Sequence, residues 1–327
     1  MNPQAILTQV KKTFSELDCT GGGVIIIKHG QTVLEEYFGE QGQRKGAKKV
    51  GPHTLFHLAS VRKAYVGYAV AYAIYHNYIA SIDDKLSDYL GNEEIFRDVS
   101  IRHLLTHTHG LHWQNEKIIK EYKAGYNWVY RDINVELLAK VIFKVTGKTI
   151  AEIVDEQVFQ TLSFTETNWF SEKNEQHIEV IHNNSPFWYE SDMCDGSKMN
   201  MYSSLRELAK WGQVHLAKGK INGNQIIPKE IIQLLTTIQS PNSKPQNLPT
   251  NGFFWFVQPQ QREGITELSP ILPQGSFQLL GYTSVALLVI PKENIVAVRG
   301  FNSFGSPDRF DYIKDIHDFG STVYQSI

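Results

Sequence analysis

Strand patterns at both ends of the chain, with a helical middle, constrain the fold more than any other feature of the sequence. Residues 21–38 read GGGVIIIKHGQTVLEEYF, two β-branched runs around a His-Gly turn, which is typical of a β-hairpin. Similar runs occupy residues 252–257, 285–290 and 295–299, and the last two are joined by the turn sequence PKEN at 291–294. Because strands must pair, we expect both ends to share one antiparallel sheet.

Helical patterns flank and separate these strands. Apolar residues of the first 17 positions and of residues 308–324 are spaced as in amphipathic helices, and residues 137–145 and 205–216 show the same period. The sequence therefore predicts an α+β fold, an antiparallel β-sheet flanked by the N- and C-terminal helices with an inserted helical lobe. The predicted domains are 1–50 plus 230–327 for the sheet and 51–229 for the helical lobe, with the active site between them.

Composition excludes several classes of protein. The chain of 327 residues has 32 basic and 34 acidic side chains and a formal charge of -2, so no nucleic-acid partner or anionic membrane surface is predicted. Cys19 and Cys194 lie far apart and predict neither a disulfide nor a cysteine metal site. The apolar run at 65–75 is too short for a transmembrane segment. No signal-peptide core precedes it, which predicts a cytoplasmic protein, or an extracytoplasmic one if a leader has been removed.

One short motif could carry chemistry. Ser60 and Lys63 form the only S-x-x-K of the chain, and they open its most hydrophobic helix. The spacing places both side chains on one helical face, where burial and the helix dipole would favour a neutral amine able to accept the Ser60 proton. The alternative is an N-capping serine followed by a solvated lysine, and the motif alone leaves both open.

The surroundings of this motif resemble a known superfamily. Residues 55–90, LFHLASVRKAYVGYAVAYAIYHNYIASIDDKLSDYL, are similar to the nucleophile helix of the serine β-lactamase and penicillin-binding-protein superfamily, closest to its class C β-lactamase and esterase branch. Further stretches agree with it in order, at residues 101–111 (with His109 where the family usually has Ser), 128–147, 201–212 and 281–300. The resemblance covers nearly the whole chain and implies the same fold.

The resemblance assigns roles to individual residues. It makes Ser60 the acylating nucleophile, Lys63 its partner and Tyr130 the residue that relays a proton between nucleophile and leaving group. Asp132 stands where the family has Asn. An aspartate still accepts a hydrogen bond from Lys63, but it lacks the amide donor and adds a charge that favours the ammonium form of Lys63.

The third motif departs further from the family pattern. Leu279 stands where a Lys or His is usual, so the cation that attracts a substrate carboxylate is absent. The backbone N–H of Tyr282, which follows Gly281, is expected to form an oxyanion hole with that of Ser60. Leu279, Thr283 and Asn302 are the residues expected to line the substrate site, and Asn302 and Arg309 are the alternative partners for a carboxylate.

A histidine cluster offers a different chemistry. His103, His107, His109 and His112 lie within ten residues and could bind zinc, although no HExxH spacing is present. The other interpretation of these residues is structural, as helix caps or core side chains.

The leading hypothesis is therefore a serine acyl hydrolase, without a cofactor, acting on an amide, β-lactam or ester of a small molecule or peptide. A catalytically impaired scaffold that binds ligand or penicillin is the first alternative, favoured by Leu279 and Asp132, and a metal-dependent hydrolase is the second.

Overall fold

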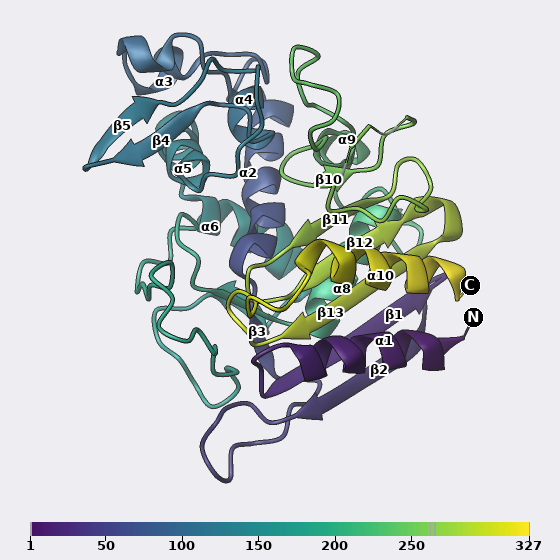
Figure 1. Cartoon of the computed structure of the whole chain (residues 1–327). Helices are drawn as coiled ribbons and strands as arrows, with labels where there is room; N and C mark the ends of the chain where they lie inside the picture. Colours follow the sequence, from purple (N-terminus) through teal and green to yellow (C-terminus); the bar gives the residue numbers. More distant parts are fainter. Residues whose placement is uncertain (1, 262, 265, 327) are drawn as a thin grey trace.

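A computed structural model describes residues 2–261, 263–264 and 266–326. Its centre is a six-stranded antiparallel sheet in the order β10-β11-β12-β13-β1-β2 (Figure 1). The strands are β1 (Gly21–Lys28), β2 (Gln31–Gly39), β10 (Phe256–Val257), β11 (Phe277–Leu280), β12 (Ala286–Ile290) and β13 (Ile295–Phe301). The register between β1 and β13 joins the two ends of the chain, so the predicted α+β fold is confirmed.

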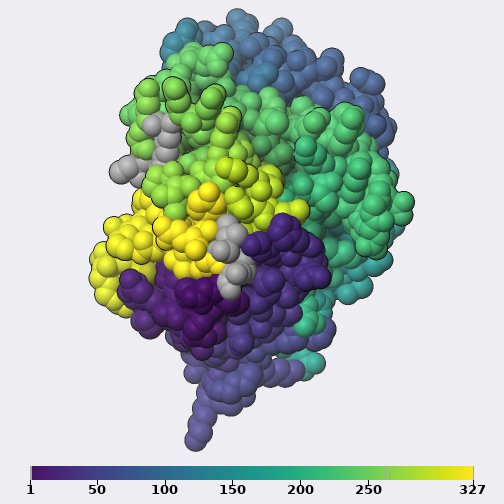
Figure 2. Space-filling model, turned by 90° about the vertical axis from the view of Figure 1, so that its right-hand side faces the viewer, coloured from purple at the N-terminus to yellow at the C-terminus, as the bar shows by residue number. Residues whose placement is uncertain are grey.

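Each face of the sheet is covered by helices. Helices α1 (Pro3–Glu16) and α10 (Tyr312–Gln325) lie side by side on one face, and the terminal segments meet on the surface (Figures 1 and 2). Alternate residues of β1 separate the faces, since Val24 and Ile26 pack with α1 and α10 whereas Ile25 and Ile27 belong to the core on the other side.

The opposite face is covered by α8 (Leu205–Leu216), which contacts β1, β12 and β13. At Gly212 an added Cβ would lie 2.6 Å from Val296 and 2.8 Å from Leu287, so the helix packs directly on the strands. The predicted helical lobe, residues 51–229, includes α8, yet α8 lies against the main sheet. Its apolar face fits the sheet as well as it would fit a helix, and sequence periodicity cannot distinguish the two.

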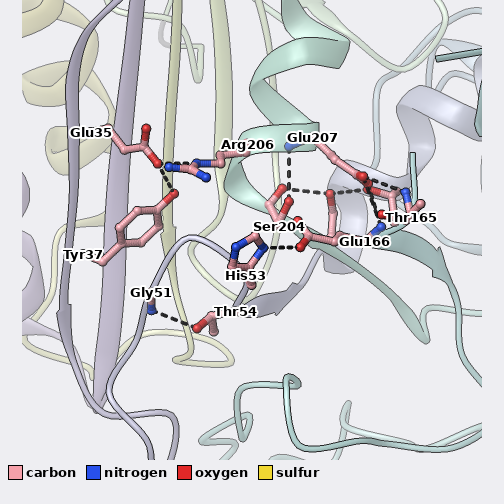
Figure 3. A network of polar contacts seen from close by, with 12 residues as sticks. Glu35, Tyr37, Gly51, His53, Thr54, Thr165, Glu166, Ser204, Arg206 and Glu207 are labelled. Atoms are coloured by element: carbon pink, nitrogen blue, oxygen red, sulfur yellow. Dashed lines mark hydrogen bonds and ion pairs between the residues drawn. The ribbon is translucent and has the colours of Figure 1, made fainter. Parts of the chain in front are cut away.

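Polar contacts fix the beginning of α8 (Figure 3). Arg206 Nε donates to Glu35 of β2 at 2.6 Å, and Tyr37 OH donates to the same carboxylate at 2.8 Å. Glu207 accepts from the backbone N–H groups of Thr165 at 2.7 Å and Glu166 at 3.1 Å. These contacts connect α8 to the main sheet and to a small sheet of β3 (Leu55–His57), β7 (Met201–Ser204) and β6 (Thr167–Trp169).

A buried ion pair joins the terminal helices to the sheet. Arg299 of β13 and Asp315 of α10 are 2% and 8% exposed and form a salt bridge. Thr13 of α1 donates its hydroxyl to the Asp315 carboxylate at 2.5 Å. Because a buried charge is costly without a partner, these three residues depend on one another.

The helical lobe surrounds α2 (Lys63–Tyr75), which is buried along most of its length and contacts α5 (Ile133–Thr146), α6 (Ile150–Val154) and α9 (Lys229–Thr236). Helix α9 therefore packs with the helical lobe, although the predicted boundary at residue 230 assigned it to the sheet. The remaining elements are α3 (Leu86–Leu90), α4 (Ile101–Leu105), β4 (Leu111–Gln114), β5 (Lys117–Lys120), α7 (Gln160–Leu162), β8 (Lys220–Ile221) and β9 (Asn224–Gln225), with short helical turns η1 (Ala59–Arg62), η2 (Glu94–Phe96), η3 (Asp155–Phe159) and η4 (Pro291–Glu293).

One predicted strand is much shorter than expected. The pattern at 252–257 yields only β10, because the backbone N–H groups of Phe253 and Phe254 donate to Leu235 and Leu105 of the helical lobe.

In the described part of the chain, no helix has the length and apolar character required to cross a membrane.

Candidate active site

Ser60 lies in a strained turn between β3 and α2. The preceding residue, Ala59, has φ of 44°, a left-handed conformation that is uncommon for a residue with a side chain. Its N–H donates to the imidazole of His57 at 3.2 Å, and its carbonyl accepts from the guanidinium of Arg62 at 3.1 Å. Both polar groups of Ala59 are therefore fixed, and Ser60 stays half-buried at the start of η1.

Lys63 is the centre of the site. Its Nζ lies 3.1 Å from Ser60 Oγ and 2.6 Å from Tyr130 OH, and it forms an ion pair with Asp132. The Lys63 side chain is only 1% exposed, so its charge depends on these partners. An ammonium has three donors, and three acceptors surround it here. The structure thus brings together the four residues predicted for the first two motifs.

Asp132 forms an ion pair with Lys63. It is the N-cap of α5 but makes no side-chain capping bond, because its carboxylate turns toward Lys63 instead. Burial opposes ionisation of this carboxyl, but the charges of Lys63 and Arg62 and the hydrogen bond from Lys63 outweigh it and hold the pKa of Asp132 well below its usual range. At neutral pH the Asp132 carboxylate is therefore charged, and it faces the Lys63 amine.

The ring of Tyr130 packs against the ring of His107. The two rings stack at 4.3 Å between centroids, and Asn134 Nδ2 lies 3.2 Å from His107 Nδ1. Burial, with a smaller effect from the charge of Lys63, lowers the pKa of His107 well below its usual range. His107 is therefore a neutral platform for Tyr130, a role that sequence reasoning missed because stacking cannot be read from the residue types.

The third motif, around Gly281, approaches the nucleophile turn, which is the turn between β3 and α2 that carries Ser60, through its backbone. Strand β11 contacts η1, and a Cβ added to Gly281 would lie 2.5 Å from the carbonyl oxygen of Leu58, so only glycine allows this approach. Leu279 is buried in β11, at 3% exposure. Thr283 is also buried, and its hydroxyl donates to the carbonyl of His57 at 2.5 Å. Thr283 therefore connects the segment after β11 to β3, just before the nucleophile turn. Its hydroxyl proton is used in this hydrogen bond and is not free for a substrate.

Two other predicted residues lie elsewhere. Asn302 is buried, and its amide oxygen accepts from the N–H groups of Thr20 and Gly21 while its nitrogen donates to Thr20 Oγ1 and the Glu179 carbonyl. Every donor and acceptor of its side chain is occupied, so the expectation that Asn302 binds substrate does not fit this geometry. Arg309 instead faces α1, 3.4 Å from the Glu16 carbonyl and from Asp18.

The histidine cluster has structural partners. His103 Nδ1 accepts from the Ser100 N–H at 3.1 Å, and His109 Nδ1 accepts from the Leu111 N–H at 3.0 Å, whereas His107 lies under Tyr130. Burial lowers the pKa of His103 to about 4 and that of His109 to about 3. Among the described residues no group of three or more His, Cys, Asp or Glu side chains is placed to hold a metal ion.

Buried neutral histidines should make the fold sensitive to acid. Burial lowers the pKa of His57 to about 3 and that of His215 to about 4, both from an ordinary value of 6.5. Below pH 6.5 these histidines take up protons in the unfolded chain but stay neutral in the folded chain. Each of them then lowers the free energy of unfolding by about 1.4 kcal/mol per pH unit, so stability falls as the pH falls. We expect a melting temperature several degrees lower at pH 5 than at pH 7. Calorimetry across this range measures it.

A matched pair of variants separates this effect from general acid denaturation. His215→Phe should flatten the dependence of the melting temperature on pH, whereas His29→Asn, at an exposed turn with φ of 50°, should leave it unchanged. Equal slopes for His215→Phe and the parent protein would contradict this explanation.

The fold and the motif residues together agree with one family of proteins. The S-x-x-K serine lies where an antiparallel sheet meets a helical lobe. The tyrosine and the aspartate of a Tyr-x-Asp sequence both contact its lysine. This arrangement fits a serine acyl-transfer scaffold. Residues 8–319 match the Beta-lactamase family, and the chain belongs to that family.

Individual relatives place the chain within it. An uncharacterized protein of Alkalihalophilus pseudofirmus is 51% identical over 323 residues, covering 98% of this chain and 95% of the relative. The teichoic acid D-alanine hydrolase of Staphylococcus aureus is 27% identical over 169 residues, 46% of this chain and 42% of that protein. The solved structure of the D-alanine carboxypeptidase AmpC from Burkholderia cenocepacia superposes with a TM-score of 0.78 at 15% identity, covering 99% of this chain and 98% of that one.

Proposed function

We propose that this protein is a serine acyl hydrolase in which Ser60 forms an acyl-enzyme with an ester, amide or β-lactam. The observation that carries the proposal is the hydrogen-bonded group of Ser60, Lys63 and Tyr130 around one buried lysine. The relatives named above are consistent with acyl transfer. Intact-mass measurement after incubation with a labelled penicillin and with a fluorophosphonate tests it, with Ser60→Ala as the reference.

The proposed reaction has two steps. In the first, Ser60 Oγ bonds to the substrate carbonyl carbon while its proton passes to the oxygen of Tyr130 as the phenolate, and then to the departing amine or alcohol as the bond to that group breaks. In the second, water adds to the acyl carbon by the same proton route and releases Ser60. In this proposal Lys63, which is paired with Asp132, contributes positive charge next to both reacting oxygens. The N–H groups of Ser60 and Tyr282 are the proposed oxyanion donors.

The proposed substrate carries no carboxylate at the position where a β-lactam carries its own. Leu279 is apolar and buried in β11, and neither Asn302 nor Arg309 replaces the missing cation. An anionic substrate would lose a charge-assisted hydrogen bond of about 1.5 to 3 kcal/mol, which corresponds to about 10- to 100-fold in rate. A neutral ester would not suffer this loss.

We expect Leu279→His to raise the rate of penicillin acylation by about tenfold, while turnover of a neutral p-nitrophenyl ester stays within a few-fold. Histidine is chosen over Leu279→Lys because the site is buried: an imidazole can stay neutral in the free protein and take up a proton beside the bound carboxylate. Leu279→Met is the apolar control and should change neither rate much. Stopped-flow acylation with both substrates measures the effect, and efficient penicillin turnover by the unmodified protein would contradict it.

The alternative, a scaffold that binds ligand without turnover, is favoured by the same Leu279 and by Asp132. It requires that neither reagent modifies Ser60 while a β-lactam or peptide still binds. Equilibrium binding measured alongside intact mass separates the two functions.

A further inference from the structure

Tyr130 lies in a segment without regular structure. Residues 127–131 form neither helix nor strand, and the tyrosine is 37% exposed. Its ring lies against His107, at 4.3 Å between centroids, and beside Trp128, at 6.3 Å. The rings of Trp128 and His107 are themselves in a T-shaped contact at 5.7 Å. A group that moves a proton must stay within hydrogen-bonding reach of the reacting atoms, so the packing of these rings matters for the proposed reaction.

Trp128 is fixed by one buried side chain, that of Asn251. The indole Nε1–H donates to Asn251 Oδ1 at 2.8 Å, and the indole ring also lies 6.1 Å from that of Phe256 in β10. Trp128 belongs to the loop before α5, whereas Asn251 shortly precedes β10. The hydrogen bond therefore connects the loop that carries Tyr130 to the edge of the main sheet.

Asn251 is itself fully buried, at 0% exposure, and is bound from several sides. Its amide nitrogen donates to the carbonyls of Phe254 at 3.4 Å and Trp255 at 3.3 Å. Its backbone N–H donates to Ser240 Oγ at 2.9 Å. Because the amide nitrogen is occupied in this way, the amide oxygen is the atom that meets the Trp128 N–H.

Phe254 adds a strained residue beside the same rings. Its φ is 68°, a left-handed conformation that is unfavourable for a bulky side chain. Its carbonyl accepts from Asn251, and its N–H donates to the Leu105 carbonyl at 2.9 Å. Both polar backbone groups are therefore bound, which maintains the strained conformation. In that conformation the Phe254 ring lies 5.6 Å from the ring of His107, which in turn stacks on Tyr130.

We propose that Asn251 is a positioning residue for Tyr130. Through Trp128 on one side and Phe254 on the other, it fixes the aromatic side chains around the tyrosine, so that the phenol oxygen stays beside the lysine and the nucleophile. The inference rests on the proposed function, because it concerns the group that moves the proton of the nucleophile. The effect of Asn251 on the rate passes through Tyr130 and not through contact with a substrate.

Stopped-flow acylation by a neutral ester tests this role in two variants. Trp128→Phe keeps an aromatic ring and removes the N–H, and Asn251→Ala removes the amide. We expect each variant to slow acylation by about tenfold or more, because a displacement of about 1 Å in a catalytic group has effects of this order. In a Tyr130→Phe background, either change should slow acylation by less than about twofold further, because the group that it positions is already absent.

Matched controls separate positioning from a general loss of stability. Trp169→Phe removes an indole N–H that donates to a backbone carbonyl at 3.2 Å, and Asn200→Ala removes an amide that donates to two backbone carbonyls at 2.9 and 3.1 Å. Both residues are buried, in or next to the small sheet. Acylation by these controls should stay within about twofold of the unmodified protein. If Trp128→Phe behaves like Trp169→Phe, or if its effect adds fully to that of Tyr130→Phe, the inference is overturned.

A spectroscopic measurement decides the inference without turnover. Fluorotyrosine incorporated at position 130 reports the surroundings of that ring through fluorine NMR. Its resonance should shift or broaden in Trp128→Phe and Asn251→Ala but not in the two control variants. An unchanged resonance in Trp128→Phe and Asn251→Ala would contradict the inference.

The same experiments distinguish this inference from the proposed function. Turnover that depends on Ser60, with Trp128→Phe as fast as its control, would leave the proposed function intact and overturn the positioning role. Absence of any Ser60-dependent turnover or labelling would overturn the proposed function. Fluorine NMR would then still decide whether Asn251 fixes the ring of Tyr130.

Discussion

Replacing Ser60 with alanine should abolish covalent labelling and reduce ester turnover by at least about 1,000-fold, the scale expected when a catalytic nucleophile is removed. Ser60 Oγ is the half-buried hydroxyl 3.1 Å from the buried Lys63 amine, and no other S-x-x-K exists in the chain. Intact mass after incubation with a fluorophosphonate, or with a labelled penicillin, should show one added group in the unmodified protein. Peptide mapping should place it on residues 55–70.

Two controls accompany this experiment. Ser15→Ala changes an exposed serine of α1 and should leave labelling unchanged. A chelator should also have no effect, whereas loss of activity in chelator with rescue by zinc would assign the chemistry to the histidines. An unmodified mass with both reagents between pH 6 and 9 would favour the binding scaffold.

Lys63→Met and Tyr130→Phe should each slow acylation by about 100-fold or more, the usual contribution of a positioned general base or of the charge that supports it. In the unmodified protein we expect the acylation rate to rise with pH through a single ionisation, because the form that accepts the Ser60 proton is the deprotonated one. Tyr130→Phe should remove that rise. Stopped-flow acylation across pH 6 to 9 measures both effects.

The structure offers a specific control for these variants. Tyr126→Phe removes the hydroxyl of an exposed tyrosine, which lies in the same loop four residues before Tyr130. It should leave the rate and its pH dependence unchanged. If Tyr130→Phe acylates as fast as Tyr126→Phe, the proton passes through another group and the proposed route is wrong.

Much of the fold was predictable because period and turn chemistry act locally. The β-branched runs at 21–38 and 285–299 form β1, β2, β12 and β13 as expected. The role of α8 was not predictable, because its contact partner is decided by Gly212 fitting against β12 and β13, which lie far away in sequence.

The candidate site was predictable where it depends on side-chain identity. Ser60, Lys63, Tyr130 and Asp132 could be placed through their motifs, and the geometry brings them together. The supporting residues could not be found in that way. The left-handed backbone of Ala59, the His57 ring that accepts its N–H and the stacking of His107 on Tyr130 carry no local sequence signal.

The position of β1 between β2 and β13 has a consequence for how the protein is made. During synthesis β1 and β2 emerge first, whereas Ile295–Phe301 appear only after most of the chain has left the ribosome. Until then the β1 backbone groups that will pair with β13 remain unpaired along a strand that is apolar on both faces, a surface prone to join other chains. We therefore expect β1 to pair with β13 only late in synthesis or after it, and fragments that end before residue 295 to aggregate rather than to retain activity.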